Sequence, residues 1–427
     1  MAWLPGNPHS VSQEQANHMR VLYLCHRIPY PPNKGEKIRA FHQLRAMAEH
    51  HEVDLFTLAD DASDLQYRSA LSGICRQVVV SALNPRWARI RALPYLLTST
   101  PLTLPCFHSA ELAAAVRDAV SARSYDRIFV YCSAMAQYVE EVEQIPILTD
   151  LVDVDSDKWL QYARFARFPY STVYRREGLA LREYERRVCA RSSAVLVTTE
   201  REAQLLREIA PGAAVQVVCN GVDTEYFAPP AQTAAPQLPT VSFVGDMSYF
   251  PNQQAVLNFA RQVLPLIRQE IPAIRFCVVG RNPNREVREL EKLQGVMVTG
   301  FVPDVRTYLA QTHVVVAPFS VAAGIQNKIL EALAFGLPVV GTPRSTQGLT
   351  PEVAGMVETG DTADELAGRI VGLLREPERA RQSGLEARKR VSTAYNWGRS
   401  LEYVLQLLKN PSSTPGPRTC EAGSRSS

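Results

Sequence analysis

The stretch VVVAPFSVAAGIQNKILEALAFGLPVVGT, residues 314–342, decides the fold. Apolar, β-branched runs at 314–317 and 338–341 predict two buried strands. Between them, a loop of small residues leads into an amphipathic segment at 328–335, which predicts a helix that stops at Gly336. A strand, a helix and a strand in this order form one right-handed crossover unit of a parallel sheet. Ligands of such sheets bind at the loops that leave the carboxyl ends of the strands.

The loop of this unit, residues 320–327, has the chemistry of an anion site. Gly324 lets a ligand approach the backbone, and Asn327 is a predicted N-cap. The N–H groups at the helix start, helped by the helix dipole, would bind a diphosphate. Glu331 follows on the first turns, and its carboxylate, which only accepts hydrogen bonds, suits a vicinal diol such as a ribose. These features predict a nucleotide-sugar site, and the alternative is an ordinary unit whose loop binds nothing.

Length and composition exclude several classes of protein. The chain has 427 residues, of which 46% are hydrophobic and 21% charged, enough for two or three domains. A net charge of +3 gives no support for nucleic-acid binding. The chain has no apolar run of about 18 residues, as a membrane-spanning helix needs. No metal is predicted, because the eight histidines form no recognisable ligand motif.

The ends of the chain and its cysteines favour a cytoplasmic protein. Residues 1–18 lack the features of a secretory signal and are predicted to be a disordered leader, and residues 411–427 a disordered tail. The eight cysteines are scattered and form no C-x-x-C motif, which fits reduced thiols.

The first half alternates strands with helices and carries two candidate sites. Lys34, Gly35 and Lys37 lie in a loop after the first strand, where they would contact a phosphate or an acceptor, or would simply be solvated. A later strand at 147–151 runs into a cluster of aspartates that begins at Asp153, which fits acid/base groups, a metal site or helix caps. No G-x-G-x-x-G follows any strand, which argues against a nicotinamide enzyme.

A basic and apolar segment follows residue 84. In it Arg86, Arg89 and Arg91 alternate with Trp87 and aliphatic residues. This pattern predicts either a helix that rests on an anionic membrane surface or an internal face with arginines that reach out to solvent.

The second half repeats the alternation after a proline- and alanine-rich linker at 224–239. Glycines follow three of its predicted strands, at Gly245, Gly280 and Gly300, where they let a ligand lie across the sheet. The cations predicted to neutralise a diphosphate are Arg281, which follows Gly280, and Lys328 at the helix start.

The stretch around Glu331 resembles a family motif. Glu331, Ala332, Ala334, Gly336, Pro338 and Val339 match the second half of the donor-site motif E-G-x-x-x-x-x-x-E-A-M-A-x-G-x-P-V of family 4 GT-B glycosyltransferases. The first glutamate of that motif is replaced by Ala323. The form G-I-Q-N-K-x-L-E-A is most similar to sugar transferases of exopolysaccharide loci and the PEP-CTERM/exosortase system.

The resemblance implies an α/β protein of GT-B fold. It implies two Rossmann-like domains that face each other across a cleft, with the C-terminal helix crossing back to the first domain. The expected domains are residues 19–223 with the crossing helix 397–410, and residues 240–396. The residues assigned to the nucleotide-sugar donor are Gly245, Arg281, Phe301, Val302, Gly324, Ile325, Gln326, Asn327, Lys328 and Glu331.

The implied reaction is transfer of a sugar from a nucleotide diphosphate, of UDP or GDP type, to a saccharide or lipid-linked acceptor, with retention of anomeric configuration. No cofactor is expected. Asp153 occupies the position of a polar residue near the transferred sugar, and Lys34, Gly35 and Lys37 match the first loop at the cleft. A cytoplasmic enzyme, peripheral at the inner membrane face through Arg86, Trp87, Arg89 and Arg91, would fit this role. The alternatives are a non-catalytic scaffold of a polysaccharide assembly system and a nucleotide-sugar epimerase of GT-B fold.

Overall fold

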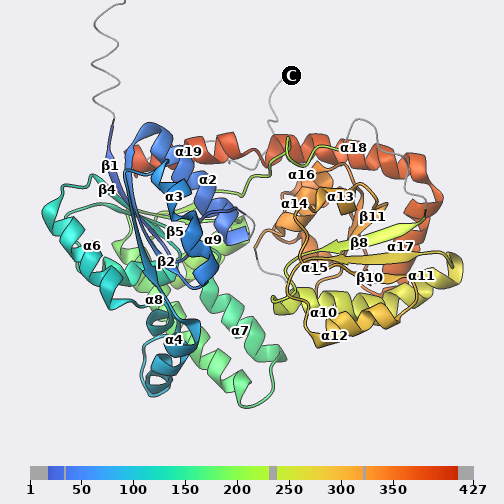
Figure 1. Cartoon of the computed structure of the whole chain (residues 1–427), viewed down its shortest axis with the longest axis horizontal. Helices are drawn as coiled ribbons and strands as arrows, with labels where there is room; N and C mark the ends of the chain where they lie inside the picture. The colour runs from blue at the N-terminus through green and yellow to red at the C-terminus, as the bar shows by residue number, and fades with distance from the viewer. Residues whose placement is uncertain (1–17, 33–34, 230–237, 321–323, 412–427) are drawn as a thin grey trace, which may run out of the picture. The chain divides into compact units, whose positions relative to one another are not determined.

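The computed structural model describes residues 18–32, 35–229, 238–320 and 324–411 (Figure 1). The chain divides into two compact units. The first runs to Val197 and takes in Glu202–Val217 and the chain from Leu401, and the second contains Thr198–Arg201 and Val218–Ser400. The predicted leader, the predicted tail beyond residue 411, Lys34 and most of the predicted linker lie outside the described residues, and the domain boundaries stay a prediction.

The first unit is built on a seven-stranded parallel sheet with strand order β3-β2-β1-β4-β5-β6-β7. Its strands are β1 Arg20–Cys25, β2 Glu52–Ala59, β3 Gln77–Ala82, β4 Arg127–Tyr131, β5 Ile147–Val152, β6 Ala194–Val197 and β7 Val215–Val217. Its helices are α2 Gly35–His50, α3 Arg68–Ser72, α4 Pro85–Ala92, α5 Thr103–Cys106, α6 Ala110–Ala122, α7 Asp155–Phe165, α8 Tyr170–Arg191 and α9 Glu200–Ile209. Strand order reverses between β1 and β4, which is the doubly wound arrangement.

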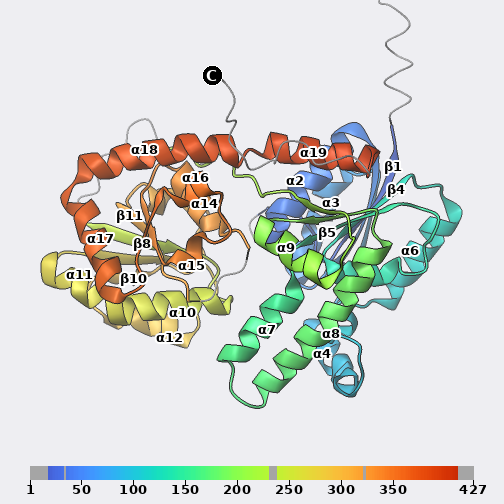
Figure 2. The same cartoon turned by 180° about the vertical axis from the view of Figure 1, so that it is seen from behind.

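The second unit has a six-stranded parallel sheet with strand order β10-β9-β8-β11-β12-β13 (Figure 2). Its strands are β8 Thr240–Val244, β9 Arg275–Val279, β10 Val296–Val298, β11 Val314–Ala317, β12 Val339–Gly341 and β13 Val357–Thr359. Its helices are α10 Phe250–Asn258, α11 Leu264–Glu270, α12 Arg285–Glu289, α13 Arg306–Leu309, α14 Asn327–Ala334, α15 Pro343–Thr346, α16 Pro351–Ala354, α17 Ala363–Arg375 and α18 Pro377–Ala394. The strand order reverses between β8 and β11, so the loops after these strands are the expected place for a ligand.

The last helix, α19 (Trp397–Lys409), belongs mostly to the first unit although α18 before it belongs to the second. Arg127 Nε of β4 donates to the carbonyl oxygen of Leu408 at 2.7 Å. The hydroxyl of Tyr403 donates to Gln216 Oε1 at 2.7 Å. The predicted return of the C-terminal helix to the first domain is therefore confirmed.

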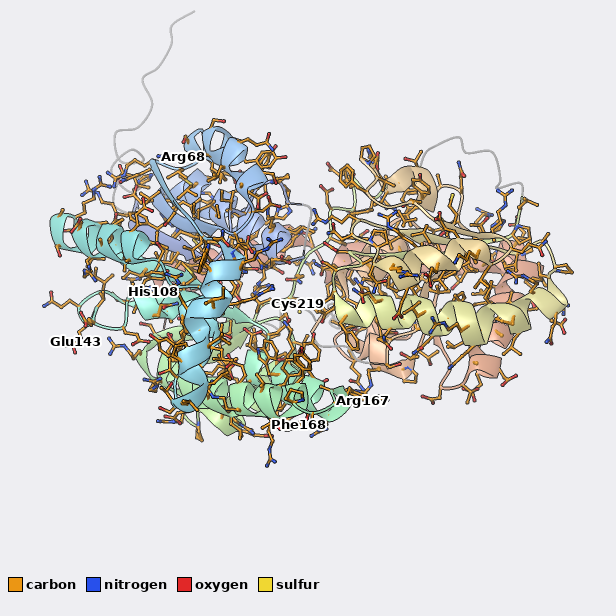
Figure 3. The ribbon with its side chains drawn as sticks, turned by 60° about the horizontal axis from the view of Figure 1, so that its bottom comes forward. Arg68, His108, Glu143, Arg167, Phe168 and Cys219 are labelled. Carbon is orange, nitrogen blue, oxygen red and sulfur yellow. The ribbon has the colours of Figure 1, made fainter. Side chains whose placement is uncertain are left out.

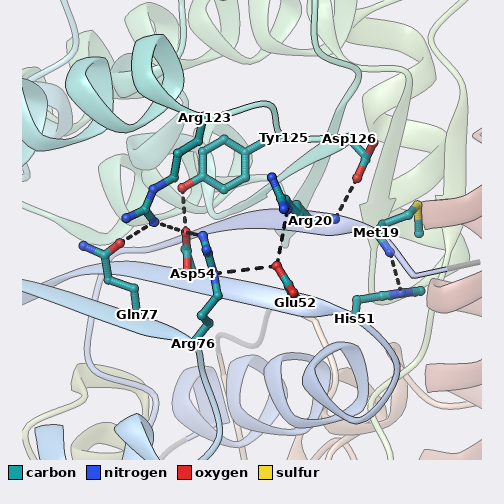
Figure 4. Close-up of polar contacts among 10 residues, drawn as sticks. All are labelled: Met19, Arg20, His51, Glu52, Asp54, Arg76, Gln77, Arg123, Tyr125 and Asp126. Carbon is teal, nitrogen blue, oxygen red and sulfur yellow. Dashed lines mark hydrogen bonds and ion pairs between the residues drawn. The ribbon is translucent and has the colours of Figure 1, made fainter. Parts of the chain in front are cut away.

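A buried polar cluster ties the amino-terminal edge of the first sheet together (Figure 4). Asp54 of β2 is 1% exposed. Its Oδ2 accepts hydrogen bonds from Arg76 at 2.5 Å, Arg123 at 2.7 Å and the hydroxyl of Tyr125 at 2.7 Å. Burial and the neighbouring carboxylate raise the pKa of Tyr125 to about 12. This cluster lies at the end of the sheet opposite to the ligand-binding loops, and its role is to hold three strand starts and their connections.

Free cysteines occur in both units of the described chain. Six cysteines are free thiols: Cys25, Cys75, Cys106, Cys132, Cys189 and Cys277. Within the described ranges, no helix combines the length and apolar character that a bilayer crossing needs.

Gly280 is a position in the second unit where a side chain is poorly tolerated. Its φ is +151°, and a Cβ would lie 1.7 Å from the carbonyl oxygen of Gly245. We expect Gly280→Ala to destabilise the protein by roughly 3 kcal/mol, because strain and overpacking add. Denaturant unfolding measures this change.

The matched control is Gly368→Ala in α17. A Cβ there would meet nothing within 4 Å. The same substitution should stabilise the protein by about 0.5–1 kcal/mol, because alanine is the better helix former. Equal effects of the two substitutions would contradict the assigned close approach.

Candidate functional site

The candidate donor site lies at the carboxyl ends of β8, β9 and β11 in the second unit. Gly245 directly follows β8, and Gly280 with Arg281 follows β9. The N–H of Gly245 donates to the carbonyl oxygen of Val279 at 2.9 Å. The loop after β11 supplies Gly324 and leads to α14, whose first turn supplies Lys328. The sheet topology thus brings together loops that are far apart in the sequence.

Lys328 is the cation at the start of α14. Its Nζ donates to Asn252 Oδ1 at 2.7 Å and lies 4.6 Å from the ring centroid of Phe319 and 5.4 Å from that of Phe243. Burial lowers the pKa of Lys328 to about 8, and the charge of Glu331 opposes this shift. An ammonium group has three donors, so hydrogen-bonding capacity remains for a ligand.

Asn252 links Lys328 to the loop after β8. It is 3% exposed, and its Nδ2 donates to the carbonyl oxygen of Asp246 at 2.8 Å. Asn252 is not among the residues that the sequence assigned to the site. Its role depends on Lys328, 76 residues further along the chain, so no local signal could have identified it.

Glu331 lies three residues after Lys328 on the same face of α14. Its carboxylate makes no hydrogen bond to any described residue in the structure. Burial raises the pKa of Glu331 to about 7, although the charge of Lys328 lowers it. A partly buried carboxylate with open acceptor positions is suited to bind two hydroxyl groups.

Arg281 is paired within the protein. Its Nε donates to Asp246 Oδ2 at 2.8 Å, and its carbonyl oxygen accepts from the N–H of Met247 at 2.9 Å. Burial alone would raise the pKa of Asp246, but hydrogen bonds from Ser248, Arg281 and Asn282 lower it overall. The prediction treated Arg281 as a cation reserved for a diphosphate, whereas Asp246 offsets much of its charge. Among the described residues, its Nη2 is buried and has no partner.

The start of α14 differs from the predicted cap. Gln326 occupies the N-cap position without a side-chain cap bond, and Asn327 is the first helical residue. The Oδ1 of Asn327 instead accepts from Asn220 Nδ2 at 3.1 Å, so the prediction of an Asn327 cap is wrong. Gly324 has φ +59°, and a Cβ on Gly348 would lie 2.3 Å from its carbonyl oxygen.

The remaining predicted donor residues lie on accessible surface. Phe301 is 70% exposed and follows Gly300, which has φ +68° and bridges to Gly280. Val302, Ile325 and Gln326 are partly buried. Ala323 lies outside the described residues, so the missing motif glutamate is not placed.

In the first unit, Asp153 follows β5 and is partly exposed. Two buried glutamates that sequence reasoning missed hold the chain next to it. Glu202 accepts from the N–H of Val154 at 2.7 Å, and Glu185 accepts from the N–H of Ser156 at 3.0 Å. Burial raises the pKa of Glu185 to about 8. The sequence of α8, which contains Glu185, gives no local sign of this role.

Lys37 differs from its predicted role. Its side chain is 4% exposed, and Nζ forms an ion pair with Asp64 Oδ2 at 2.6 Å. The lysine predicted to contact a phosphate or an acceptor is therefore used inside the first unit. Gly35 begins α2, as the loop pattern requires, and Lys34 is not described.

Comparison with known proteins gives the class. Residues 238–376 match the family model "Glycosyl transferases group 1", which confirms the predicted glycosyltransferase class for this part of the chain. No curated protein matches the sequence significantly.

Solved structures give the fold. The sucrose-phosphate synthase of Thermosynechococcus elongatus has a TM-score of 0.69 at 18% identity, over 92% of this chain and 99% of that one. HepE of Anabaena, solved with UDP and glucose, has a TM-score of 0.65 at 16% identity, over 92% and 99%. TarM of S. aureus has a TM-score of 0.63 at 11% identity, over 92% and 100%. At such identities the likeness establishes the fold alone, and it confirms GT-B.

The raised pKa of Glu331 predicts a pH-dependent cost to stability. With a folded pKa of about 7 against an ordinary 4.5, stability from this group is present below pH 4.5 and lost as pH rises through 7. The free energy of unfolding of Glu331→Gln, relative to that of the wild type, should therefore increase by on the order of 2–3 kcal/mol between about pH 5 and about pH 8. Unfolding curves at both pH values test this, and parallel profiles would contradict the burial of the carboxylate.

Proposed function

We propose that the chain transfers a sugar from a nucleotide diphosphate to a saccharide or lipid-linked acceptor, with retention of configuration. The observation that carries the proposal is the pair formed by Lys328 and Glu331 on one face of α14. One group is a hydrogen-bond donor with capacity left, and the other is an acceptor without a described partner. A diphosphate joined to a ribose presents the complementary groups in one molecule.

The departing diphosphate is stabilised by positive charge, and the site has few groups that carry it. Lys328 and the amino end of α14 are the main contributors. Arg281 adds its Nη2, since its Nε is engaged by Asp246. We assign no nucleophile, and Asp153 stays a candidate for the catalytic group near the transferred sugar.

The identity of the donor and acceptor rests on analogy. HepE was solved in complex with UDP-glucose, so a UDP-sugar is the first donor to test. The segment G-I-Q-N-K-I-L-E-A at 324–332 supports a role in exopolysaccharide synthesis of the PEP-CTERM/exosortase type. In this role the enzyme would work at the cytoplasmic face of a membrane, with Arg86, Trp87, Arg89 and Arg91 of α4 near the lipid.

Glu331→Ala should abolish transfer, because it removes the acceptor of the ribose hydroxyls. We expect kcat/KM to fall by about 100-fold or more, since two charge-assisted hydrogen bonds to the diol are lost and each contributes about 1.5–3 kcal/mol. Turnover of UDP-sugars and calorimetric binding of UDP measure the effect. Glu286→Ala, at an exposed glutamate of α12, is the matched control and should behave as the wild type.

Two outcomes would favour other functions. A wild-type chain that neither binds nor turns over any nucleotide sugar would be a scaffold. Conversion of one free nucleotide sugar into another would identify an epimerase. Unchanged donor affinity and rate in Glu331→Ala would reject the assigned role of this carboxylate.

Donor affinity should be highest between about pH 7 and 8. Below this window Glu331, with a pKa of about 7, becomes protonated and loses its charge and part of its acceptor capacity. Above it Lys328, with a pKa of about 8, loses its charge. Calorimetric titration of UDP across this range measures both limbs. Glu331→Gln should lose only the acidic limb, and a flat wild-type profile would contradict the assignment.

A further inference from the structure

The exposed apolar side chains of the first unit are concentrated in two segments. In the described part of this unit, all but Leu65 of the large hydrophobic side chains that are exposed lie between residues 87 and 97 or between 165 and 179. They are Trp87 (64%), Ile90 (53%), Leu93 (57%), Tyr95 (39%), Leu97 (94%), Phe165 (58%), Phe168 (84%), Tyr170 (63%) and Leu179 (53%). The first segment is α4 with the 3-10 turn Leu93–Leu97, and the second comprises the end of α7, the turn after it and the first half of α8.

The same two segments are strongly basic. Residues 86–97 and 164–179 together contain seven arginines and one acidic residue, the buried Glu177, while the whole chain has a net charge of only +3. Arg86, Arg89, Arg164, Arg167 and Arg175 are exposed among the apolar side chains. Apolar groups mixed with arginines, with a single acidic residue that is buried and hydrogen-bonded, are suited to the interface of an anionic membrane.

Hydrogen bonds join the two segments into one surface. Arg176 of α8 donates through Nη2 to the carbonyl oxygens of Tyr95 at 2.5 Å and Thr100 at 2.7 Å, and also to that of Thr98. Glu177 accepts from the N–H groups of Leu102 at 2.7 Å and Thr103 at 2.9 Å. Figures 1 and 2 both show α4 beside the hairpin of α7 and α8.

We propose that this docking surface, formed by residues 86–97 and 164–179, binds an anionic phospholipid membrane. A second copy of the chain is a poorer occupant, because a self-complementary contact would bring the arginines of both copies together. An internal face is excluded by the exposure of Leu97 and Phe168. The inference deepens the proposed function, since it would bring the enzyme to a lipid-linked acceptor, but its test needs neither donor nor acceptor.

The test is flotation of the full chain with vesicles. Vesicles of phosphatidylcholine alone are compared with vesicles of phosphatidylcholine and phosphatidylglycerol in equal parts. We expect binding to the anionic vesicles, weakened by salt, and little binding to the zwitterionic ones. Equal binding to both would overturn the electrostatic part of the proposal. Failure to bind either, with reversible self-association through the same residues, would assign the surface to a second copy and overturn it entirely.

Two variants separate the apolar from the basic contribution. Arg164→Glu with Arg167→Glu should lower the partition coefficient by about tenfold or more, as each arginine near an anionic surface contributes several-fold. Leu97→Ser with Phe168→Ser should weaken binding to a similar degree through lost apolar burial. Full binding by both variants would overturn the proposal.

The matched control changes the same residue types elsewhere in the unit. Leu65→Ser with Arg68→Glu alters an exposed leucine and an exposed arginine, and Arg68 lies well away from Arg167 and Phe168 (Figure 3). This control should bind vesicles like the wild type. UDP binding should be unchanged in all variants, which separates failure of this inference from failure of the proposed donor site.

Discussion

The candidate donor site depends on the close approach of two backbone segments, at Gly245 and Gly280. With a Cβ 1.7 Å from a carbonyl oxygen, no other residue fits at Gly280 without moving the loops apart. This approach places the chain after β8 next to the chain after β9, so that Arg281 reaches Asp246. The same chain after β8 continues to Asn252, which holds Lys328. The two cations of the site are therefore placed by one steric constraint.

The charges of the site are nearly balanced before any ligand binds. The charge of Asp246 offsets that of Arg281, and the charges of Glu331 and Lys328 attract each other. Burial shifts the pKa of Lys328 down to about 8 and that of Glu331 up to about 7, so both charges are held at a cost. A ligand that accepts hydrogen bonds from Lys328 and donates them to Glu331 would offset the cost of burying these charges. Binding sites often reduce the stability of the free protein in this way.

The two units have different roles. The second places polar groups at the ends of its central strands. The first uses buried carboxylates to hold its framework: Asp150 accepts from Arg39 at 2.7 Å and from Gln43 at 2.5 Å, and Glu202 and Glu185 hold the chain around Asp153. These carboxylates form their hydrogen bonds inside the unit. The docking surface at residues 86–97 and 164–179 lies outside this buried framework.

The sequence alone determined the local elements. Periodicity and turn chemistry, which act over a few residues, predict the strands at 314–317 and near 339–341. They also predict the helix between these strands and its end before Gly336. It also predicted Lys328 and Glu331, because both lie in one helix. Only the tertiary structure decided their partners. Asn252 with Lys328, Asp246 with Arg281 and Asp64 with Lys37 are pairs from separate elements, and which elements meet depends on strand order. Pairing between side chains of separate elements depends on their distance in space. The periodicity of the sequence does not predict that distance.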